Sequence, residues 1–137
     1  MPSEFMSGVN LGGWISQYWQ ASKEHFDTFI REEDIERIAS WGMDHVRLPL
    51  DYPVIESDLH PGVYLEEGLH YIDKCLEWCE KYGLGLVLDL HRAPGYSFGT
   101  LDTNTLFDDE TDQQRFVASG RCLQSDIEIN ATNSGLN

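Results

Sequence analysis

Residues 84–91 read Leu-Gly-Leu-Val-Leu-Asp-Leu-His, a nearly continuous apolar run that ends with an aspartate and a histidine. A strand with one face in water alternates apolar and polar residues, whereas a continuous run is typical of a strand covered on both faces in a parallel sheet. Gly83 directly precedes the run and indicates the end of a helix. The stretch therefore predicts a parallel strand that follows a helix.

The two segments before this strand also alternate between helix and strand. Between Tyr64 and Tyr82, apolar residues recur at spacings of three and four, which places them on one face of a predicted helix. Residues 43–48 are rich in Val and Leu, and they predict a second strand. We expect Pro49 to close that strand, because proline cannot donate a hydrogen bond to a sheet.

The N-terminal segments predict one more strand and one more helix. Residues 9–14, Val-Asn-Leu-Gly-Gly-Trp, predict a short strand that ends in a glycine turn, and an aromatic-rich loop follows it. Residues 32–41 carry acidic residues in the first turn and precede Gly42, the pattern of a helix and its C-terminal cap.

Downstream of the residue 84–91 strand, the pattern fades. A loop over residues 92–107 leads to a polar segment at 108–118 that predicts the start of a third helix. Residues 119–137 show no helical or strand stripe and are interpreted as a mostly irregular tail, so 1–118 form the folded portion and 119–137 an unpatterned addition.

Strands that alternate with helices at this spacing predict an α/β fold with right-handed βαβ units and a parallel sheet. The spacing alone fits either an open sheet or a closed barrel. A complete (β/α)8 barrel needs about 250 residues and eight units, whereas the 137-residue chain contains about three. Any barrel is therefore expected to be partial, and its open sheet edges could allow self-association.

The composition excludes several classes of partner. A formal charge of −15, from 24 acidic and 9 basic residues, disfavours nucleic acid and anionic membranes. No apolar run approaches the roughly 20 residues that span a bilayer. No secretory signal is visible, so the sequence as written predicts a cytoplasmic protein, or a secreted one if an upstream signal is missing. The three cysteines, an odd number without metal-type spacing, are expected to be reduced thiols.

Two side chains stand out where the strands end. Arg47 and His91 fall toward the carboxyl ends of their strands, where parallel α/β folds carry their functional surface. A guanidinium inside a sheet requires an anionic partner, and pairing with Asp89 or Glu56 for purely structural reasons is an open alternative. His91 could equally be a hydrogen-bonded packing residue.

A metal site and a nucleotide site are weaker alternatives. Asp89 and His91 project from the same strand face, with His45 one strand away, and could hold a metal in a metal-dependent hydrolase. Arg47 argues against it, because its positive charge would lie beside the ion. Residues 8–13 lack both the phosphate-loop lysine and the full dinucleotide spacing, so nucleotide binding is unsupported.

Aromatic residues follow each of the three strands. They are Trp14, Tyr18 and Trp19 after the first, Tyr52 after the second, and Tyr96 and Phe98 after the third. Sugar rings stack on aromatic faces through their apolar C–H surface, so this distribution favours a saccharide groove. Ordinary packing within loops is the alternative.

Three motifs together carry a family resemblance: Gly-Val-Asn-Leu-Gly-Gly-Trp at 8–14, His-Val-Arg-Leu-Pro at 45–49 and Leu-Asp-Leu-His-Arg-Ala-Pro-Gly at 88–95. In this order and spacing they resemble glycoside hydrolase family 5, over about residues 7–118. The resemblance implies a partial (β/α)8 TIM barrel, retaining hydrolysis of β-glucans, and no metal or organic cofactor. It also implies that Arg47 orients the nucleophilic glutamate and that His91 contacts the sugar. From the aromatic residues after the strands, Trp14 and Tyr52 are expected as further substrate-binding residues.

The resemblance assigns no catalytic residue to this sequence. Retaining hydrolysis uses a carboxylic acid and a nucleophilic carboxylate, which the family places at the ends of its fourth and seventh strands, the first within an Asn-Glu pair. No Asn-Glu pair occurs here, so we expect a truncated or frame-shifted relative that binds β-glucan or cello-oligosaccharide and is inactive by itself. The alternative is a noncatalytic glucan-binding or interaction module. Arg92 is a second departure, since relatives often have histidine or glycine there.

Overall fold

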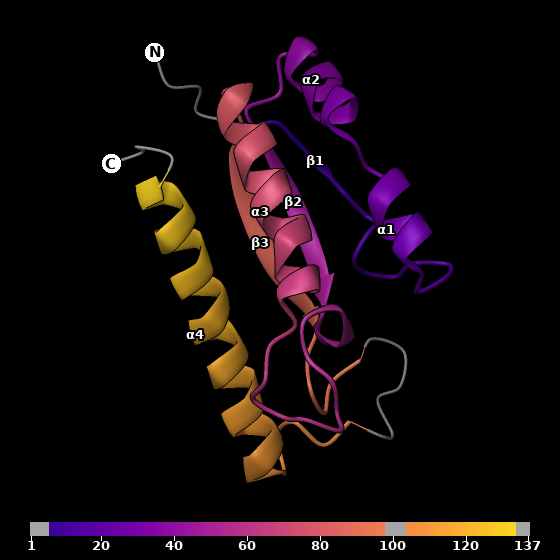
Figure 1. The fold of residues 1–137 in the computed structure, drawn as a ribbon, viewed down its shortest axis with the longest axis vertical. Coiled ribbons are helices and arrows are strands. Elements are labelled where there is room, and N and C mark those ends of the chain that lie inside the picture. The colour runs from indigo at the N-terminus through magenta and orange to yellow at the C-terminus, as the bar shows by residue number, and fades with distance from the viewer. Residues whose placement is uncertain (1–5, 98–103, 134–137) are drawn as a thin grey trace. The chain divides into compact units, whose positions relative to one another are not determined.

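The computed structural model describes residues 6–97 and 104–133 (Figure 1). Phe98 and the last four residues of the expected tail lie outside this description. In chain order the elements are β1 (Gly8–Asn10), α1 (Lys23–Thr28), α2 (Glu32–Ser40), β2 (His45–Asp51), a 3-10 turn η1 (Tyr52–Val54), α3 (Glu66–Lys81), β3 (Gly85–Arg92) and α4 (Glu110–Asn133). Strands alternate with helices, as the sequence predicts for an α/β fold.

The described residues divide into two compact units. Unit 1 contains the residues up to Pro49 together with Lys74–Asp89, and so holds β1, α1, α2 and most of β2 and β3. Unit 2 contains Leu50–Asp73 together with the residues from Leu90 onward, and so holds η1, the loop after β3, and α4.

The three strands form one sheet in the order β1-β2-β3. β1 runs parallel to β2, with Gly8 opposite His45 and Asn10 opposite Arg47. The ladder continues one residue beyond β1, where the Leu11 amide donates to the Arg47 carbonyl at 2.9 Å. The predicted parallel sheet is confirmed, and its register places Asn10 beside Arg47.

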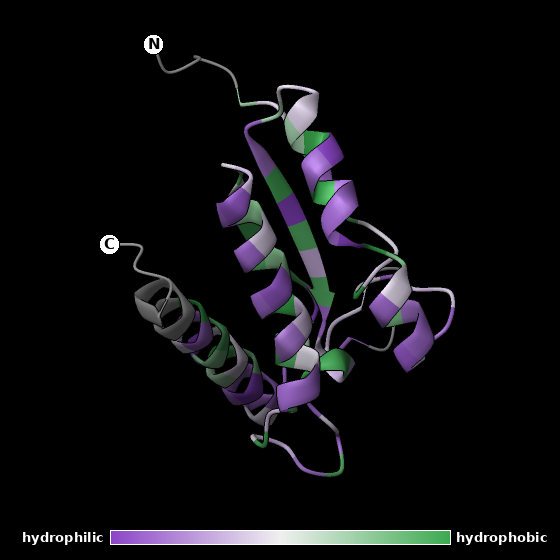
Figure 2. Ribbon diagram, turned by 45° about the horizontal axis from the view of Figure 1, so that its top comes forward, coloured by the Kyte–Doolittle hydropathy of each residue, from purple (hydrophilic) through white to green (hydrophobic). Residues whose placement is uncertain are grey.

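Strand β2 alternates between apolar and polar side chains, as the bands of colour along its arrow show (Figure 2). Val46, Leu48 and Leu50 are buried, whereas His45 and Arg47 are only partly so. One face of the strand is therefore committed to the core, and the other carries the polar groups.

The expected closure of this strand at Pro49 is wrong, because β2 continues to Asp51. The Arg47 carbonyl bonds to Leu11, so alternate positions from Arg47 direct their peptide groups toward β1. Pro49 is the next such position and lies past Asn10, the last residue of β1. No ladder bond is required from Pro49, so proline is tolerated there.

The helix predictions hold for α2 and α3 and miss α1. Helix α2 ends at Ser40, and Gly42 lies just past its end as expected, with a φ of +81° that a residue without Cβ adopts without strain. Helix α1 lies inside the stretch expected to be a loop. Ser22 caps its N-terminus through a 3.1 Å bond from the His25 amide to the Ser22 hydroxyl.

The expected irregular tail is wrong for residues 119–133, because α4 continues to Asn133. Helix α4 has little amphipathic pattern, and one turn before buried Leu123 its buried position is a serine, Ser119. The Ser119 hydroxyl donates to the Arg115 carbonyl at 2.9 Å, which satisfies this polar group inside the helix. A prediction based on apolar residues at helical spacing therefore does not detect this part of the helix.

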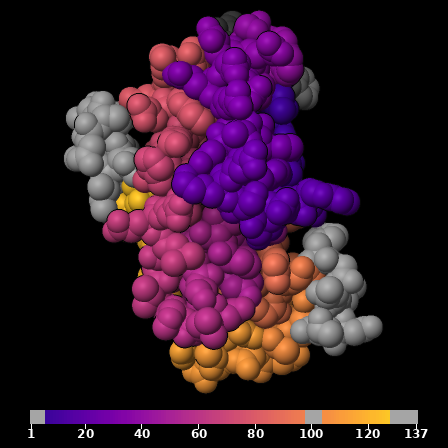
Figure 3. Space-filling view, turned by 45° about the vertical axis from the view of Figure 1, so that its right-hand side comes forward, coloured from indigo at the N-terminus to yellow at the C-terminus, as the bar shows by residue number. Residues whose placement is uncertain are grey.

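The core of unit 1 forms around Trp14, Ile35, Val46 and Leu48, each fully buried. The N-terminal loop and α1 form a continuous indigo area of the surface in Figure 3. Among the residues that the structure describes, no helix is both long and apolar enough to cross a bilayer.

The cysteine side chains behave as small apolar groups. Cys75 and Cys79 are buried free thiols, as expected. The Cys75 pKa is raised by its hydrogen bond with Cys79 and by burial, so Cys75 stays a thiol at neutral pH. Cys122, also a free thiol, is half-buried.

Candidate functional site

Three polar side chains meet on adjacent strands of unit 1. The Arg47 guanidinium donates through Nη1 to Asn10 Oδ1 at 2.8 Å and through Nη2 to Asp89 Oδ2. Asn10 ends β1, and Asp89 lies in the second half of β3. Arg47 is the third of the seven residues of β2, nearer the start of the strand than the expected carboxyl end. The expectation that Arg47 needs a carboxylate is confirmed, and Asp89 rather than Glu56 supplies it.

This strand triad, Asn10, Arg47 and Asp89, orients a guanidinium more than it stabilises the fold. The Arg47 and Asp89 side chains are 41% and 31% exposed, and ion pairs at such positions typically contribute about 0–1 kcal/mol. Two partners on two different strands nevertheless fix the plane of the guanidinium, whose five N–H donors have a rigid geometry. The arrangement can hold a carboxylate or a sugar hydroxyl in a defined position.

A second polar group lies in unit 2, around a small cavity of about 170 Å³. Tyr52, in the 3-10 turn after β2, has its ring almost fully buried. The Arg92 guanidinium lies over this ring, 5.4 Å from the centroid, at the end of β3. The cavity is lined by Tyr52, Arg92, Ala93, Gly95, Tyr96, Ser97 and Asn104.

The Tyr52 hydroxyl is fixed by a carboxylate. It donates to Asp58, at 3.0 Å to Oδ2 and 3.1 Å to Oδ1. Burial disfavours the phenolate, and the negative charge of Asp58 adds to this effect, so the Tyr52 pKa is raised above its usual value near 10. Tyr52 therefore acts as a neutral donor with a fixed ring, and not as an acid or a base near neutral pH.

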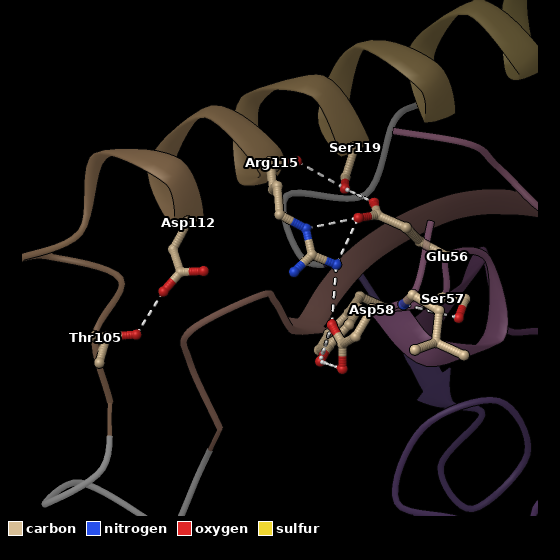
Figure 4. Close-up of polar contacts among 9 residues, drawn as sticks. Glu56, Ser57, Asp58, Thr105, Asp112, Arg115 and Ser119 are labelled. Carbon is tan, nitrogen blue, oxygen red and sulfur yellow. Dashed lines mark hydrogen bonds and ion pairs between the residues drawn. The ribbon is translucent and has the colours of Figure 1, made fainter. Parts of the chain in front are cut away.

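Arg115 of α4 holds Asp58 in turn (Figure 4). Its Nη2 lies 3.0 Å from Asp58 Oδ1, and its Nε and Nη2 lie 2.7 Å and 2.6 Å from Oε1 of buried Glu56. The Ser119 hydroxyl, which donates to the Arg115 carbonyl, also lies 3.3 Å from the other Glu56 oxygen. Sequence reasoning missed Arg115 and Asp58, because these partners are far apart in the chain and lie in segments without a strong pattern.

The remaining predicted residues have different surroundings. Trp14 is fully buried, stacks on Trp78 at 6.3 Å between centroids, and donates through Nε1 to the Phe26 carbonyl at 2.8 Å. A buried ring has no free face for a sugar in this chain. His91 is half-buried and is the penultimate residue of β3, and Trp19 is 98% exposed.

A metal centre finds no support in the part of the chain that the structure describes. No group of three or more His, Cys, Asp or Glu side chains is placed to hold an ion there. Asp89, one of the two ligands considered from the sequence, is paired with Arg47.

Comparison with known proteins assigns the chain to a family. The model of the cellulase family, glycosyl hydrolase family 5, matches residues 5–123. The chain belongs to glycosyl hydrolase family 5. Its family-5 relatives include Endoglucanase C of Acetivibrio thermocellus, 66% identical over 119 residues, and Cellodextrinase A of Ruminococcus flavefaciens, 46% identical over 112 residues.

These family-5 matches cover most of this chain and a minority of each relative. The alignments span 87% and 81% of the chain but 35% and 32% of the two relatives. The chain thus spans about a third of the length of the curated relatives that it matches. The sequence resemblance to the family and the partial α/β barrel that it implied are confirmed.

Solved structures agree on the fold. A crystal structure titled AoRut superposes with a TM-score of 0.69, at 21% identity, over 95% of this chain and 45% of its own. The exo-beta-1,4-mannosidase Op5Man5 from Opitutaceae bacterium strain TAV5 superposes with a TM-score of 0.65, at 24% identity, over 93% of this chain and 23% of its own. At these identities the likeness establishes the family-5 fold alone.

Proposed function

We propose that this chain provides the first βα units of a retaining β-glucan hydrolase of family 5. The observation that carries the proposal is the 66% identity to an endoglucanase over 87% of the chain. Of the two relatives named above, one is an endoglucanase and the other a cellodextrinase. β-Glucan and cello-oligosaccharides are therefore the proposed substrates.

In this proposal the strand triad prepares one catalytic position. Retaining hydrolysis needs a nucleophilic carboxylate about 5–5.5 Å from the acid, held in one orientation. The Arg47 guanidinium, fixed by Asn10 and Asp89, supplies charged donors of the right kind to hold such a carboxylate. Arg47 is thus proposed as a positioning residue, and His91 as a contact to the sugar.

The chain by itself is proposed to lack hydrolytic activity. Its sequence has no Asn-Glu pair, and within residues 6–97 and 104–133 the sheet has three strands, fewer than the four that would reach the family's first catalytic position. Without the acid and the nucleophile, neither leaving-group protonation nor attack on the anomeric carbon is assisted.

The test is release of reducing sugar from soluble β-glucan by the purified chain, and by the chain mixed with the C-terminal two thirds of Endoglucanase C. The proposal expects no release of sugar by the chain by itself and measurable release by the mixture. Arg47→Ala should reduce release by the mixture at least about 100-fold, since loss of a group that orients a nucleophile has effects of this order. Substantial turnover by the purified chain would contradict the missing-catalyst account.

A noncatalytic saccharide-binding module is the second candidate, favoured by the cavity beside Tyr52. It predicts that cello-oligosaccharides bind the chain without being cleaved. Chemical shift changes on titration with cellotetraose, with no new reducing ends, would support this function. If the mixture with the Endoglucanase C segment then stays inactive, the module is favoured over the hydrolase.

A further inference from the structure

We propose that the cavity beside Tyr52 binds a carboxylate-bearing sugar, and that Arg92 is the residue that selects it. The inference rests on the proposed function only in taking this cavity as a saccharide site. It adds a substrate class, acidic β-glucosides with a C6 carboxylate, to the neutral glucans proposed above.

One charged side chain lies in the described cavity wall. Of the seven lining residues, Arg92 is charged and the other six are neutral. Among the described residues that line it, the wall therefore presents one positive charge and no carboxylate. Asn104 closes part of it, accepting from the Ser97 amide at 3.0 Å and donating to the Ser97 carbonyl at 3.2 Å.

Arg92 differs from Arg47 and Arg115 in its partners. In the described parts of the chain, Arg47 is paired with Asp89, and Arg115 with Glu56 and Asp58. Arg92 joins no ion pair among these residues, and its guanidinium lies 5.4 Å from the centroid of the Tyr52 ring. A guanidinium carries five N–H donors in a planar fork, the geometry that binds a carboxylate with two parallel hydrogen bonds.

The Tyr52 ring and its neighbours are already held in position before any ligand binds. The Tyr52 ring is held by Asp58, and Arg115 offsets the negative charge of Asp58 at 3.0 Å. Arg115 also lies 5.5 Å from the Tyr52 ring centroid. A ligand that contacts Tyr52 and Arg92 therefore meets a surface that does not have to be ordered on binding, which favours affinity.

The volume of the cavity limits the size of its ligand. The cavity of about 170 Å³ is smaller than the roughly 300–1,000 Å³ of pockets that enclose drug-sized ligands. It suits one substituted sugar unit, with the remainder of the chain outside. A C6 carboxylate adds one charged group to a glucose unit with little change in its size.

The experiment titrates the full 137-residue chain with cellobiose and with cellobiouronic acid, which differ in the C6 carboxylate, and follows binding by calorimetry and amide chemical shifts. A charged hydrogen-bonded pair predicts at least about tenfold tighter binding of the acid. Arg92→Gln is expected to remove this preference, so that the acid binds no more tightly than cellobiose. Arg121→Gln, a change at an exposed arginine of α4, is the matched control and should preserve the preference.

The remaining outcomes of this experiment each contradict the proposal. Equal binding of the two sugars, or an equal loss of both in Arg92→Gln with native circular dichroism, overturns the acid-sugar inference and leaves the neutral-glucan proposal standing. Loss of the preference in Arg121→Gln would point to surface charge and also overturn it. Binding of neither sugar overturns this inference together with the cavity as a saccharide site, while the mixing experiment with Endoglucanase C still tests hydrolysis.

Discussion

The guanidinium of Arg115 donates through Nε to Oε1 of Glu56, 59 positions earlier in the sequence, and its Nη2 lies 2.6 Å from the same oxygen. The Glu56 side chain is fully buried and that of Arg115 is 15% exposed. A charge pair in this environment contributes little net stability when complete, but removal of one partner leaves an uncompensated charge. The pair therefore ties α4 to the loop after η1.

Arg115→Met is expected to destabilise the chain by about 3–5 kcal/mol, the usual cost of leaving a buried charge unpaired. Urea unfolding followed by circular dichroism measures the change. Lys81→Met is the matched control, because it breaks an ion pair with Glu32 whose side chains are 59% and 42% exposed, and its cost should stay below about 1 kcal/mol. Equal losses of stability in the two variants would contradict the special cost of breaking the buried Glu56 pair. The double variant Glu56→Leu/Arg115→Met, which removes both charges, should recover part of the lost stability.

Tyr52 should titrate later than an ordinary tyrosine. Burial and Asp58 raise its pKa above about 10, so between the unfolded and the folded pKa the native state binds more protons than the unfolded state. Its contribution to stability is thus complete below pH 10 and is lost as pH rises through the folded pKa. Absorbance titration at 295 nm should show a late-ionising phenol that Tyr52→Phe removes.

A carboxamide at position 58 separates the two causes of this shift. Asp58→Asn removes the negative charge and leaves the ring buried, so the Tyr52 pKa should fall toward 10 without reaching it. Tyr64, also raised by burial, gives a second late phenol that this variant should leave nearly unchanged. An unaltered Tyr52 titration in Asp58→Asn would contradict the assigned contribution of Asp58.

The strands and helix α3 could be predicted because the sequence patterns that indicate them are local. The apolar run ending at His91 and the three-and-four spacing between Tyr64 and Tyr82 each report burial within a single element. The Arg47–Asp89 pair also followed, as one of two options, because a guanidinium inside a sheet must meet an anion.

What could not be predicted depends on contacts between distant segments. Ser119 and Arg115 become meaningful only when Glu56 lies against them, and nothing near Glu56 in the sequence indicates α4. Pro49 stays in β2 because β1 ends before reaching it, a fact about a neighbouring strand. The stacking of the Trp14 ring on Trp78 is likewise a contact between distant segments, which the sequence near Trp14 does not indicate.

Gly68 should resist replacement although it lies in a helix. Alanine normally stabilises a helix by about 1 kcal/mol relative to glycine, but a Cβ at position 68 would overlap the carbonyl oxygen of Val54, which is backbone and cannot turn aside. We therefore expect Gly68→Ala to lower the free energy of unfolding by about 1–3 kcal/mol, as is typical of overpacking. Thermal and urea unfolding provide the measurement.

Gly120 in α4 is the natural comparison, because a Cβ there would meet no atom within 4 Å. Gly120→Ala should raise stability by up to about 1 kcal/mol through helix propensity. The same sign of change in both variants would refute the close approach of α3 to Val54.

The strand triad should show weak coupling between its charges. Arg47 and Asp89 are 41% and 31% exposed, so a double-mutant cycle with Arg47→Met and Asp89→Leu is expected to give a coupling energy of about 0.2–1 kcal/mol. Urea unfolding of the four proteins supplies the cycle. A coupling energy above about 2 kcal/mol would instead assign Arg47 a mainly structural role and weaken its proposed part in positioning the nucleophile.

The two neighbouring tryptophans of the N-terminal loop should behave in opposite ways. Trp14 is fully buried, stacks on Trp78 and donates to the Phe26 carbonyl, so Trp14→Ala removes a large core side chain and should cost about 3–5 kcal/mol. Trp19 is 98% exposed, and Trp19→Ala should change stability by less than about 0.5 kcal/mol. Because a sugar can stack only on an accessible ring face, cellotetraose binding that depends on Trp19 at unchanged stability would move the saccharide contact from the predicted Trp14 to Trp19. Binding that survives Trp14→Phe with its affinity intact would confirm that the indole at position 14 serves packing.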